Sequence, residues 1–334
     1  MKDSAIFDVI IVGGGPAGLA AGIYSRRATM HTLLLERRLL GGQIAISKDV
    51  ENYPGIEGIT GFELAERMTA QARSTGLEIE EREVVEVVPG VRCHAVRLDD
   101  GTVLRATALI IAAGGTARKL NVPGEEQYLG SGVSYCATCD GPFFRDRAVV
   151  VIGGGDTAVE ESVYLARLAR SVTLVHRGTE LRATRILQER LHAVPNIEVM
   201  RSTIVTAVNG DGRSVRSIGL EQVETGERRE LPADGIFILI GYEPNTRLVP
   251  PEIDRDPEGF VITDLKCATN VPGIFVAGDL RRKYANQIVI ASADGATAAL
   301  AASRYVEARP AEVQEAPVCT VVQQGLSSDS RAFA

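Results

Sequence analysis

Residues 7–18 read FDVIIVGGGPAG, a short apolar and β-branched run followed at once by glycines. A helical pattern continues over residues 19–27. A strand, a glycine-rich turn and a helix with the spacing GxGxxG predict the phosphate-binding turn of a dinucleotide-binding unit. In such a turn Gly13 makes the tight bend, Gly15 lets a pyrophosphate approach the backbone, and Gly18 lets helix and strand pack closely.

Glu36 adds a second signature to this turn. Residues 31–35 predict a second strand, and Glu36 stands at its end. A carboxylate at that distance from the glycines can accept hydrogen bonds from ribose hydroxyls. An ordinary glycine turn does not explain the carboxylate, so we interpret residues 7–36 as a nucleotide-binding unit.

The same pattern occurs a second time. Residues 148–152 form an apolar run, residues 153–158 read GGGDTA, and a helical pattern follows over residues 159–168. This is GxGxxA, in which alanine takes the place of the third glycine. One fingerprint begins at Gly13 and the other at Gly153, and a second strand ends at the same spacing after each. The chain therefore contains an internal repeat.

The two copies differ in charge where the second strand ends. The first copy has Glu36, whereas the second has His176-Arg177, followed by Arg182 and Arg185. A carboxylate suits free ribose hydroxyls, and guanidinium groups suit a 2′-phosphate. We therefore expect an FAD- or NAD-like nucleotide in the first unit and an NADP-like nucleotide in the second. The alternative for the arginines is a solvated helix face.

A pair of cysteines lies between the two fingerprints, in the sequence CATCD at residues 136–140. Two cysteines at this spacing can close a small disulfide ring that is reduced and reoxidised without large backbone movement. Asp140 follows the second sulfur and offers a proton donor and acceptor. The alternative is half of a zinc site, but the other cysteines stand alone and no pair of the four histidines has ligand spacing. We therefore predict a redox-active disulfide and no metal.

The bulk properties limit the function classes. A length of 334 residues favours two domains, and a net charge of −7 argues against a nucleic-acid or anionic-membrane binder. We find no signal-peptide layout and no apolar run that could span a bilayer. An odd number of cysteines with one close pair suits a reducing compartment, so we expect a cytoplasmic protein. The segment from about residue 307 has a composition typical of a mobile tail, and we expect Cys319 within it to be an incidental thiol.

Together these motifs make the chain resemble the low-molecular-weight, bacterial-type thioredoxin reductases, which are FAD-dependent pyridine nucleotide-disulfide oxidoreductases. The match runs from about residue 8 to residue 305. Its most specific parts are GGGPAG at 13–18, ENYPG at 51–55, CATCDG at 136–141, GGGDTAVEE at 153–161 and Gly278-Asp279.

The resemblance implies an α/β fold with two dinucleotide-binding, Rossmann-like three-layer domains, the second inserted into the first. Residues 1–117 and 246–310 would form the FAD-binding domain. Residues 118–245 would bind NADPH and carry the disulfide, and residues 311–334 would be a flexible tail. The family resemblance also implies a homodimer.

The resemblance further implies a reaction. NADPH would pass a hydride to FAD, and FAD would pass two electrons to the Cys136–Cys139 disulfide. Cys139 would face the flavin, Cys136 would attack the disulfide of thioredoxin or a similar small redox protein, and Asp140 would act as general acid and base. The implied FAD contacts are Gly13, Gly15, Pro16, Ala17, Gly18, Glu36, Gly42, Gln43, Asn52, Val84, Ala113, Gly114, Asp279, Gln287 and Ile288. The implied NADPH contacts are Gly153, Gly155, Asp156, Thr157, Ala158, His176, Arg177, Arg182 and Gly241.

Three positions depart from the family pattern. Gly178 replaces a second arginine after His176, Asn286 stands where arginine is common, and Tyr242 stands where histidine is frequent. These departures leave two alternatives open: a relative that takes electrons from ferredoxin or another donor, and a dithiol oxidase that passes electrons to oxygen. The intact second fingerprint favours NADPH over both.

Two further classes are disfavoured. The flavoprotein of a peroxide-reducing system needs an N-terminal redox domain, which we do not expect because the first fingerprint begins at Gly13. A non-catalytic flavin-binding regulator does not need the complete set of Cys136, Cys139 and Asp140.

Overall fold

The computed structural model describes residues 6–47 and 50–309. Its contacts divide the chain into two compact units. The first is formed by the N-terminal segment to residue 45, residues 63–114 and the segment from 244 onward; the second is formed by residues 46–62 and 115–243. The expected tail at 311–334, with Cys319, lies outside the described residues.

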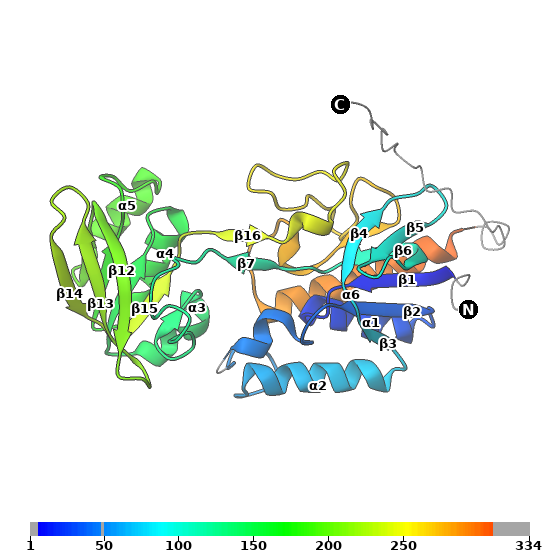
Figure 1. Ribbon diagram of the computed structural model, residues 1–334, viewed down its shortest axis with the longest axis horizontal. Coiled ribbons are helices and arrows are strands. Elements are labelled where there is room, and N and C mark those ends of the chain that lie inside the picture. The colour runs from blue at the N-terminus through cyan, green and yellow to red at the C-terminus, as the bar shows by residue number, and fades with distance from the viewer. Residues whose placement is uncertain (1–5, 48–49, 310–334) are drawn as a thin grey trace, which may run out of the picture. The chain divides into compact units, whose positions relative to one another are not determined.

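The first unit is built on a seven-stranded sheet (Figure 1). Its centre is β1 (Ile6–Val12), which pairs in parallel with β2 on one side and β6 on the other. The residues of these central strands that are fully buried include Ile10, Leu34 and Leu109, as a parallel sheet covered on both faces requires. The other strands are β2 (Thr32–Glu36), β3 (Glu78–Glu81), β4 (Val84–Val88), β5 (His94–Leu98), β6 (Val103–Ile111) and β17 (Ile274–Val276).

Strand β6 corrects a reading of the sequence pattern. From the sequence alone, residues 103–105 and 108–115 predict two separate strands, whereas the structure has one strand of nine residues. The first half of β6 pairs antiparallel with β5, and Leu109–Ile111 pair in parallel with β17. Because the two halves have different neighbours, their burial patterns differ, and this difference resembled two strands.

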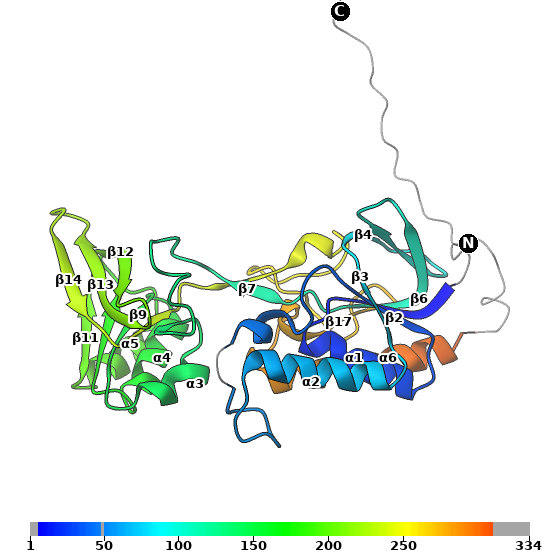
Figure 2. The ribbon, with the colours of Figure 1, turned by 60° about the horizontal axis from the view of Figure 1, so that its bottom comes forward.

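Helices α1 (Pro16–Arg27) and α6 (Ile288–Glu307) pack against one another in the first unit (Figures 1 and 2). Their backbones approach so closely that a Cβ at residue 295 would lie 1.9 Å from the carbonyl oxygen of Ala17. The start of α1 is thereby held against α6. The remaining helical segments of this unit are α2 (Gly61–Ser74), η1 (Gly42–Ile46), η3 (Thr246–Leu248) and η4 (Gly278–Leu280).

The second unit contains a five-stranded parallel sheet in the order β11-β10-β9-β15-β8 and a three-stranded antiparallel sheet. The parallel strands are β8 (Val133–Ser134), β9 (Ala148–Ile152), β10 (Ser171–Val175), β11 (Ile197–Met200) and β15 (Gly235–Ile238). The antiparallel strands are β12 (Thr203–Gly210), β13 (Val215–Gln222) and β14 (Arg228–Pro232). The helical segments are α3 (Ala137–Asp140), η2 (Gly141–Phe144), α4 (Asp156–Leu165) and α5 (Arg185–His192).

From the sequence alone, the apolar pattern over residues 197–208 predicts one strand, but the structure has two, β11 and β12, separated by residues 201–202. Ser202 stands at the break with φ +47°, in the left-handed region. The chain there leaves the parallel sheet and joins the antiparallel one, so a single continuous strand is wrong.

The internal repeat is visible in the backbone hydrogen bonds of the two units. Gly13 N donates to Leu35 O at 2.9 Å, and Gly153 N donates to Val175 O at 3.1 Å. The second glycine of each fingerprint accepts from the loop after the second strand: Gly14 O from Gly41 N at 2.8 Å, and Gly154 O from Arg182 N at 2.7 Å. The predicted fold class, two dinucleotide-type α/β units, is confirmed.

The chain leaves the first unit after Gly114 and returns at Pro244. The two crossing segments pair with each other as β7 (Gly115–Ala117) and β16 (Tyr242–Pro244). Asn245 N donates to Gly114 O at 3.0 Å, which fixes the two ends of the first unit beside one another. Within the described residues no helix combines the length and the apolar character that crossing a membrane demands.

Candidate functional site

The three glycines of the GxGxxG pattern in the first fingerprint have different surroundings, and each explains why a side chain is absent there. Gly13 has φ +109°, and a Cβ there would lie 2.4 Å from Ala112 O. A Cβ at residue 18 would lie 1.8 Å from Gly13 O, so helix and turn pack backbone to backbone. A Cβ at residue 15 would meet no heavy atom within 4 Å. Gly15 therefore faces open space at the start of α1, which is where a pyrophosphate would approach the helix N-terminus.

Glu36 and Gly42 lie beside this turn. Glu36 Oε2 accepts a hydrogen bond of 2.6 Å from Gly14 N, and its Oε1 accepts one of 3.0 Å from Arg38 N. A carboxylate has about four acceptor positions, so these bonds orient the group and leave capacity for ribose hydroxyls. Gly42 packs over Gly15, because a Cβ at residue 42 would lie 3.4 Å from the Cα of Gly15. Gln43 follows in η1 and is exposed.

Asp279 reaches the same fingerprint from the far end of the sequence. It follows β17 in η4, directly after Gly278. Gly278 has φ +76°, and a Cβ there would lie 2.9 Å from the Cβ of Ala17, in the first turn of α1. The fold thus brings the turn that contains Asp279 against Ala17. Gln287 is the N-cap residue of α6, and Ile288 is its first residue.

The remaining predicted flavin contacts do not all lie at the fingerprint turn. Asn245 Nδ2 donates to Ala113 O at 2.8 Å, and Gly114 follows at the crossing. Val84 is buried in the core of the first unit together with Val12 and Leu35. Asn52 lies in residues 46–62, which group with the second unit, so it is not among the residues that the first unit collects.

The predicted redox pair forms a disulfide in the second unit. Cys136 is the N-cap residue of α3, and Cys139 N donates to Cys136 Sγ at 3.2 Å. Ser134 Oγ accepts from Cys136 N at 3.0 Å and holds the segment before the ring. A backbone N–H aimed at Cys136 Sγ would stabilise a thiolate there once the disulfide is reduced. Asp140 ends α3 and is half-buried beside the pair.

A buried carboxylate that sequence reasoning missed supports this segment. Glu125 is 1% exposed and accepts hydrogen bonds from Leu120 N at 2.9 Å, Asn121 N at 2.6 Å and the Tyr135 hydroxyl at 2.8 Å. Burial and the Glu125 carboxylate raise the pKa of Tyr135, so the hydroxyl stays protonated and donates. Glu125 therefore ties residues 120–121 to the residue that precedes Cys136.

Glu125→Ala is expected to lower the free energy of unfolding by about 3 kcal/mol, because it leaves three backbone N–H groups and the Tyr135 hydroxyl without their acceptor. The neighbouring variant Glu126→Ala is the control, since Glu126 is exposed and pairs with Lys119 at the surface. Urea unfolding followed by circular dichroism measures both. Equal unfolding midpoints for the two variants would contradict the buried role of Glu125.

The second fingerprint repeats the open position of the first. A Cβ at residue 155 would meet no heavy atom within 4 Å, whereas a Cβ at residue 153 would lie 2.5 Å from both Leu239 O and the Cβ of Ala158. The middle glycine, absent from our predicted contacts, is also required: a Cβ at residue 154 would lie 2.2 Å from His176 Nδ1. Asp156 Oδ1 accepts from Thr184 N at 2.7 Å, and Thr157 follows in the first turn of α4.

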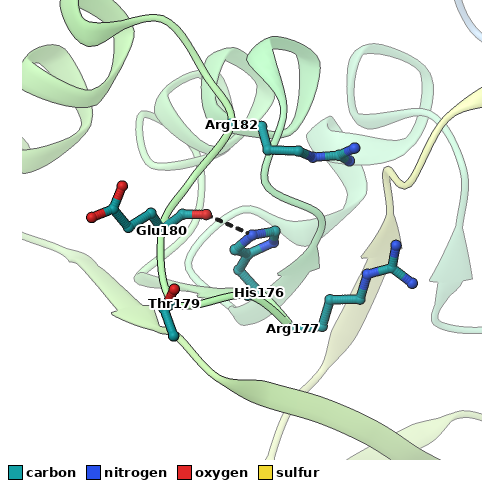
Figure 3. Close-up of a pocket in the computed structure, with 6 residues that line it drawn as sticks. His176, Arg177, Thr179, Glu180 and Arg182 are labelled. Carbon is teal, nitrogen blue, oxygen red and sulfur yellow. Dashed lines mark hydrogen bonds between the residues drawn. The ribbon is translucent and has the colours of Figure 1, made fainter.

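The loop after β10 forms an open pocket lined by residues 176–180 and Arg182. His176 Nε2 hydrogen-bonds to Glu180 O at 2.9 Å, and the buried ring organises the loop. Figure 3 shows the side chains of Arg177 and Arg182 extending to one side of this ring, away from Glu180. Two guanidinium groups on one side of a pocket suit a phosphate.

Of the arginines that the sequence suggested for a 2′-phosphate, Arg182 and Arg185 differ in their position relative to this pocket. Arg182 lies in the loop and lines the pocket, whereas Arg185 begins α5 and does not line it. Gly241 lies elsewhere in the second unit, with φ +122° and its carbonyl accepting from Arg118 N at 3.0 Å. Sequence reasoning missed Thr179 and Glu180, since neither residue type carries a nucleotide signature.

The described part of the chain contains no group of three or more His, Cys, Asp or Glu side chains that could hold a metal ion.

Comparisons with known proteins agree with these features. The family model described as pyridine nucleotide-disulphide oxidoreductase matches residues 7–295. The thioredoxin reductases of Listeria innocua and Treponema pallidum are 44% and 46% identical to this chain, over 92% and 90% of it and 96% and 97% of their own lengths. The crystal structure of thioredoxin reductase from Streptococcus pyogenes superposes with a TM-score of 0.89 at 39% identity, covering 92% of this chain and all of that one. The chain belongs to the pyridine nucleotide-disulphide oxidoreductase family and, within it, to the thioredoxin reductases.

Proposed function

We propose that this chain is an NADPH-dependent thioredoxin reductase whose physiological substrate is oxidised thioredoxin or a similar small redox protein. The observation that carries the proposal is the Cys136–Cys139 disulfide, in a chain that also contains two fingerprint turns with open positions at Gly15 and Gly155. A regulator that only binds nucleotide has no use for a dithiol at this position. The thioredoxin reductases among its relatives support the choice of substrate.

The residues present fit both nucleotides. In the first unit, the open space at Gly15, the oriented Glu36 carboxylate and Asp279 suit the pyrophosphate, ribose and polyol of FAD. In the second unit, the open space at Gly155 and the guanidinium groups of Arg177 and Arg182 suit NADPH. We assign the flavin to the first unit and NADPH to the second. Bound flavin would accept a hydride from NADPH and deliver two electrons to the disulfide.

The chain's own residues would carry out the exchange. Two electrons and two protons convert the disulfide into two thiols, and Asp140 is placed to supply and remove a proton beside them. Cys136 as a thiolate attacks one sulfur of the substrate disulfide and displaces the other as a thiolate. Cys139 then attacks Cys136 Sγ, which releases the reduced substrate and restores the disulfide. We further propose that the protein is a cytoplasmic homodimer. The family resemblance implies the dimer, and the odd number of cysteines with one close pair favours a reducing compartment.

The test is an anaerobic titration of the flavin-loaded protein with NADPH and, separately, with NADH, followed by flavin absorbance. We expect NADPH to bleach the flavin and oxidised thioredoxin to restore the absorbance. Bleaching by reduced ferredoxin or a dithiol, but by neither nucleotide, would overturn the NADPH assignment and select one of the alternative donors.

Arg182→Met is expected to raise the KM for NADPH about 10- to 100-fold, because one charged hydrogen bond to the 2′-phosphate is lost. The KM for NADH should stay within about twofold, since NADH lacks that phosphate. Arg185→Met is the matched control, because Arg185 does not line the pocket. Steady-state kinetics with both nucleotides measure the effect, and an equal rise for NADH would contradict a phosphate contact.

A further inference from the structure

Asp279 belongs to a cluster of four charged side chains, and the proposed function gives no role to the other three, Arg281, Lys283 and Asp294. Lys283 Nζ lies 2.7 Å from Asp279 Oδ1 and 3.5 Å from Asp294 Oδ2. Arg281 Nη1 lies 2.8 Å from Asp294 Oδ1. The cluster thus contains two cations and two carboxylates.

These charges are shielded from water. The side chain of Lys283 is 5% exposed, those of Asp294 and Arg281 are 10% and 14% exposed, and that of Asp279 is 25% exposed. Asp279 Oδ1 and Lys283 Nζ themselves are fully buried atoms. The intervening Arg282 is 65% exposed and pairs with Asp256. A buried charge is costly unless an opposite charge lies beside it, so each carboxylate of the cluster needs a cation next to it.

Asp294 and Arg281 form a pair that is complete without the lysine. Asp294 projects from α6, and its Oδ2 accepts from Gly278 N at 3.2 Å while its Oδ1 accepts from Arg281. Arg281 Nε also donates to Thr263 Oγ1 at 2.7 Å. This pair fastens the η4 segment to α6. The charge of Lys283 is therefore needed for the second carboxylate, Asp279.

Asp279 is the carboxylate that stands beside the fingerprint helix, because Gly278 packs against Ala17. We propose that Lys283 is a positioning residue for flavin binding, which holds the Asp279 carboxylate oriented toward the hydroxyls of the flavin polyol. This inference rests on the proposed binding of FAD in the first unit. Lys283 acts through Asp279 and is not a catalytic residue.

Loss of the ammonium group would leave Asp279 Oδ1 buried without its counter-ion. The carboxylate would then turn away from this position toward solvent, and it would no longer face the polyol as an acceptor. We expect Lys283→Met to weaken the binding of FAD to the flavin-free protein by about tenfold or more, the effect of losing one charged hydrogen bond. Lys283→Arg, which keeps the charge, should recover most of the affinity.

The experiment titrates flavin-free protein with FAD and follows the quenching of flavin fluorescence. Arg282→Met is the matched control, since it removes one positive charge from the same segment but from an exposed position. Thermal unfolding of the flavin-free forms shows separately whether a variant is merely less stable. Asp279→Asn, alone and combined with Lys283→Met, completes a double-mutant cycle and gives a folded background if Lys283→Met alone does not fold.

The proposal requires that Lys283→Met weakens FAD binding, that Arg282→Met does not, and that Lys283→Met has no further effect when residue 279 is asparagine. Equal affinity of the wild type and Lys283→Met, equal losses for Lys283→Met and Arg282→Met, or additive effects in the cycle would each overturn it. Failure of the wild-type protein to bind FAD would instead overturn the proposed function, so the two failures are distinguishable.

Discussion

Cys136→Ser is expected to lower the NADPH-dependent reduction of thioredoxin by a factor of about 1,000 or more, because serine can neither form the disulfide nor attack another one. Cys267, the free cysteine of the described residues, is buried, so its thiol cannot take the place of the missing sulfur. Reduction of the flavin by NADPH should remain, since the fingerprint turns are unchanged. The substitution therefore separates reduction of the flavin by NADPH from reduction of thioredoxin by the cysteine pair.

Stopped-flow absorbance measures the two steps separately: bleaching of the flavin on mixing with NADPH, and turnover with thioredoxin added. Cys267→Ala is the matched control. Burial raises the pKa of the Cys267 thiol to about 11, so this thiol is protonated at neutral pH and does not enter disulfide exchange. Substantial thioredoxin reduction by Cys136→Ser would contradict the assignment of Cys136 as the attacking sulfur.

Gly15→Ala and Gly18→Ala are expected to weaken FAD binding alike but to differ in stability, although both add a single methyl group to one fingerprint. The methyl group at residue 15 points into open space, so the flavin-free protein should keep its stability. FAD affinity should nevertheless fall by about 100-fold, because the methyl group occupies the space that the pyrophosphate needs against the backbone. The methyl group at residue 18 would lie 1.8 Å from Gly13 O, so stability and FAD binding should both be lost.

Thermal unfolding of the flavin-free proteins and titration with FAD distinguish the two profiles. Gly155→Ala extends the test to the second unit, where the FAD content should be normal and the KM for NADPH raised. If Gly15→Ala retains full FAD affinity, the open position at the start of α1 is not the pyrophosphate site.

The sequence was sufficient where a function depends on residues close together in the chain. The fingerprint at 13–18, the strand ending in Glu36 and the cysteine pair are each local patterns, and their spacing encodes their geometry. The structure bears out the two α/β units and the Cys136–Cys139 disulfide.

Features that depend on distant partners could not be predicted in this way. The continuity of β6 follows from a partner strand near the other end of the chain, β17. The break at Ser202 follows from a change of sheet, and apolar periodicity is the same on both sides of it. The contact between Gly278 and Ala17 joins segments that are far apart in the sequence, and no local sequence pattern predicts it.

The supporting side chains of the site were missed for a related reason. Glu125 and Lys283 belong to residue types that are usually exposed, and a sequence does not show that a particular carboxylate or ammonium group is buried. Glu125 follows Gly124 in a segment that reads as a linker, and Lys283 is one of three consecutive basic residues. Their roles emerge only from the atoms that surround them.

The paired crossing segments β7 and β16 have a consequence for how the second unit is inserted into the chain. Because Asn245 N donates a hydrogen bond to Gly114 O, the polypeptide of the first unit is interrupted at a point where the residues on the two sides of the insertion are in contact. An insertion between touching ends leaves the host's core undisturbed, and it can be lengthened, exchanged or removed without redesign of the sheet on either side. The segment from Gly115 to Glu243, which supplies all of the second unit except residues 46–62, is in this sense an insertion, and the paired strands β7 and β16 mark its two boundaries.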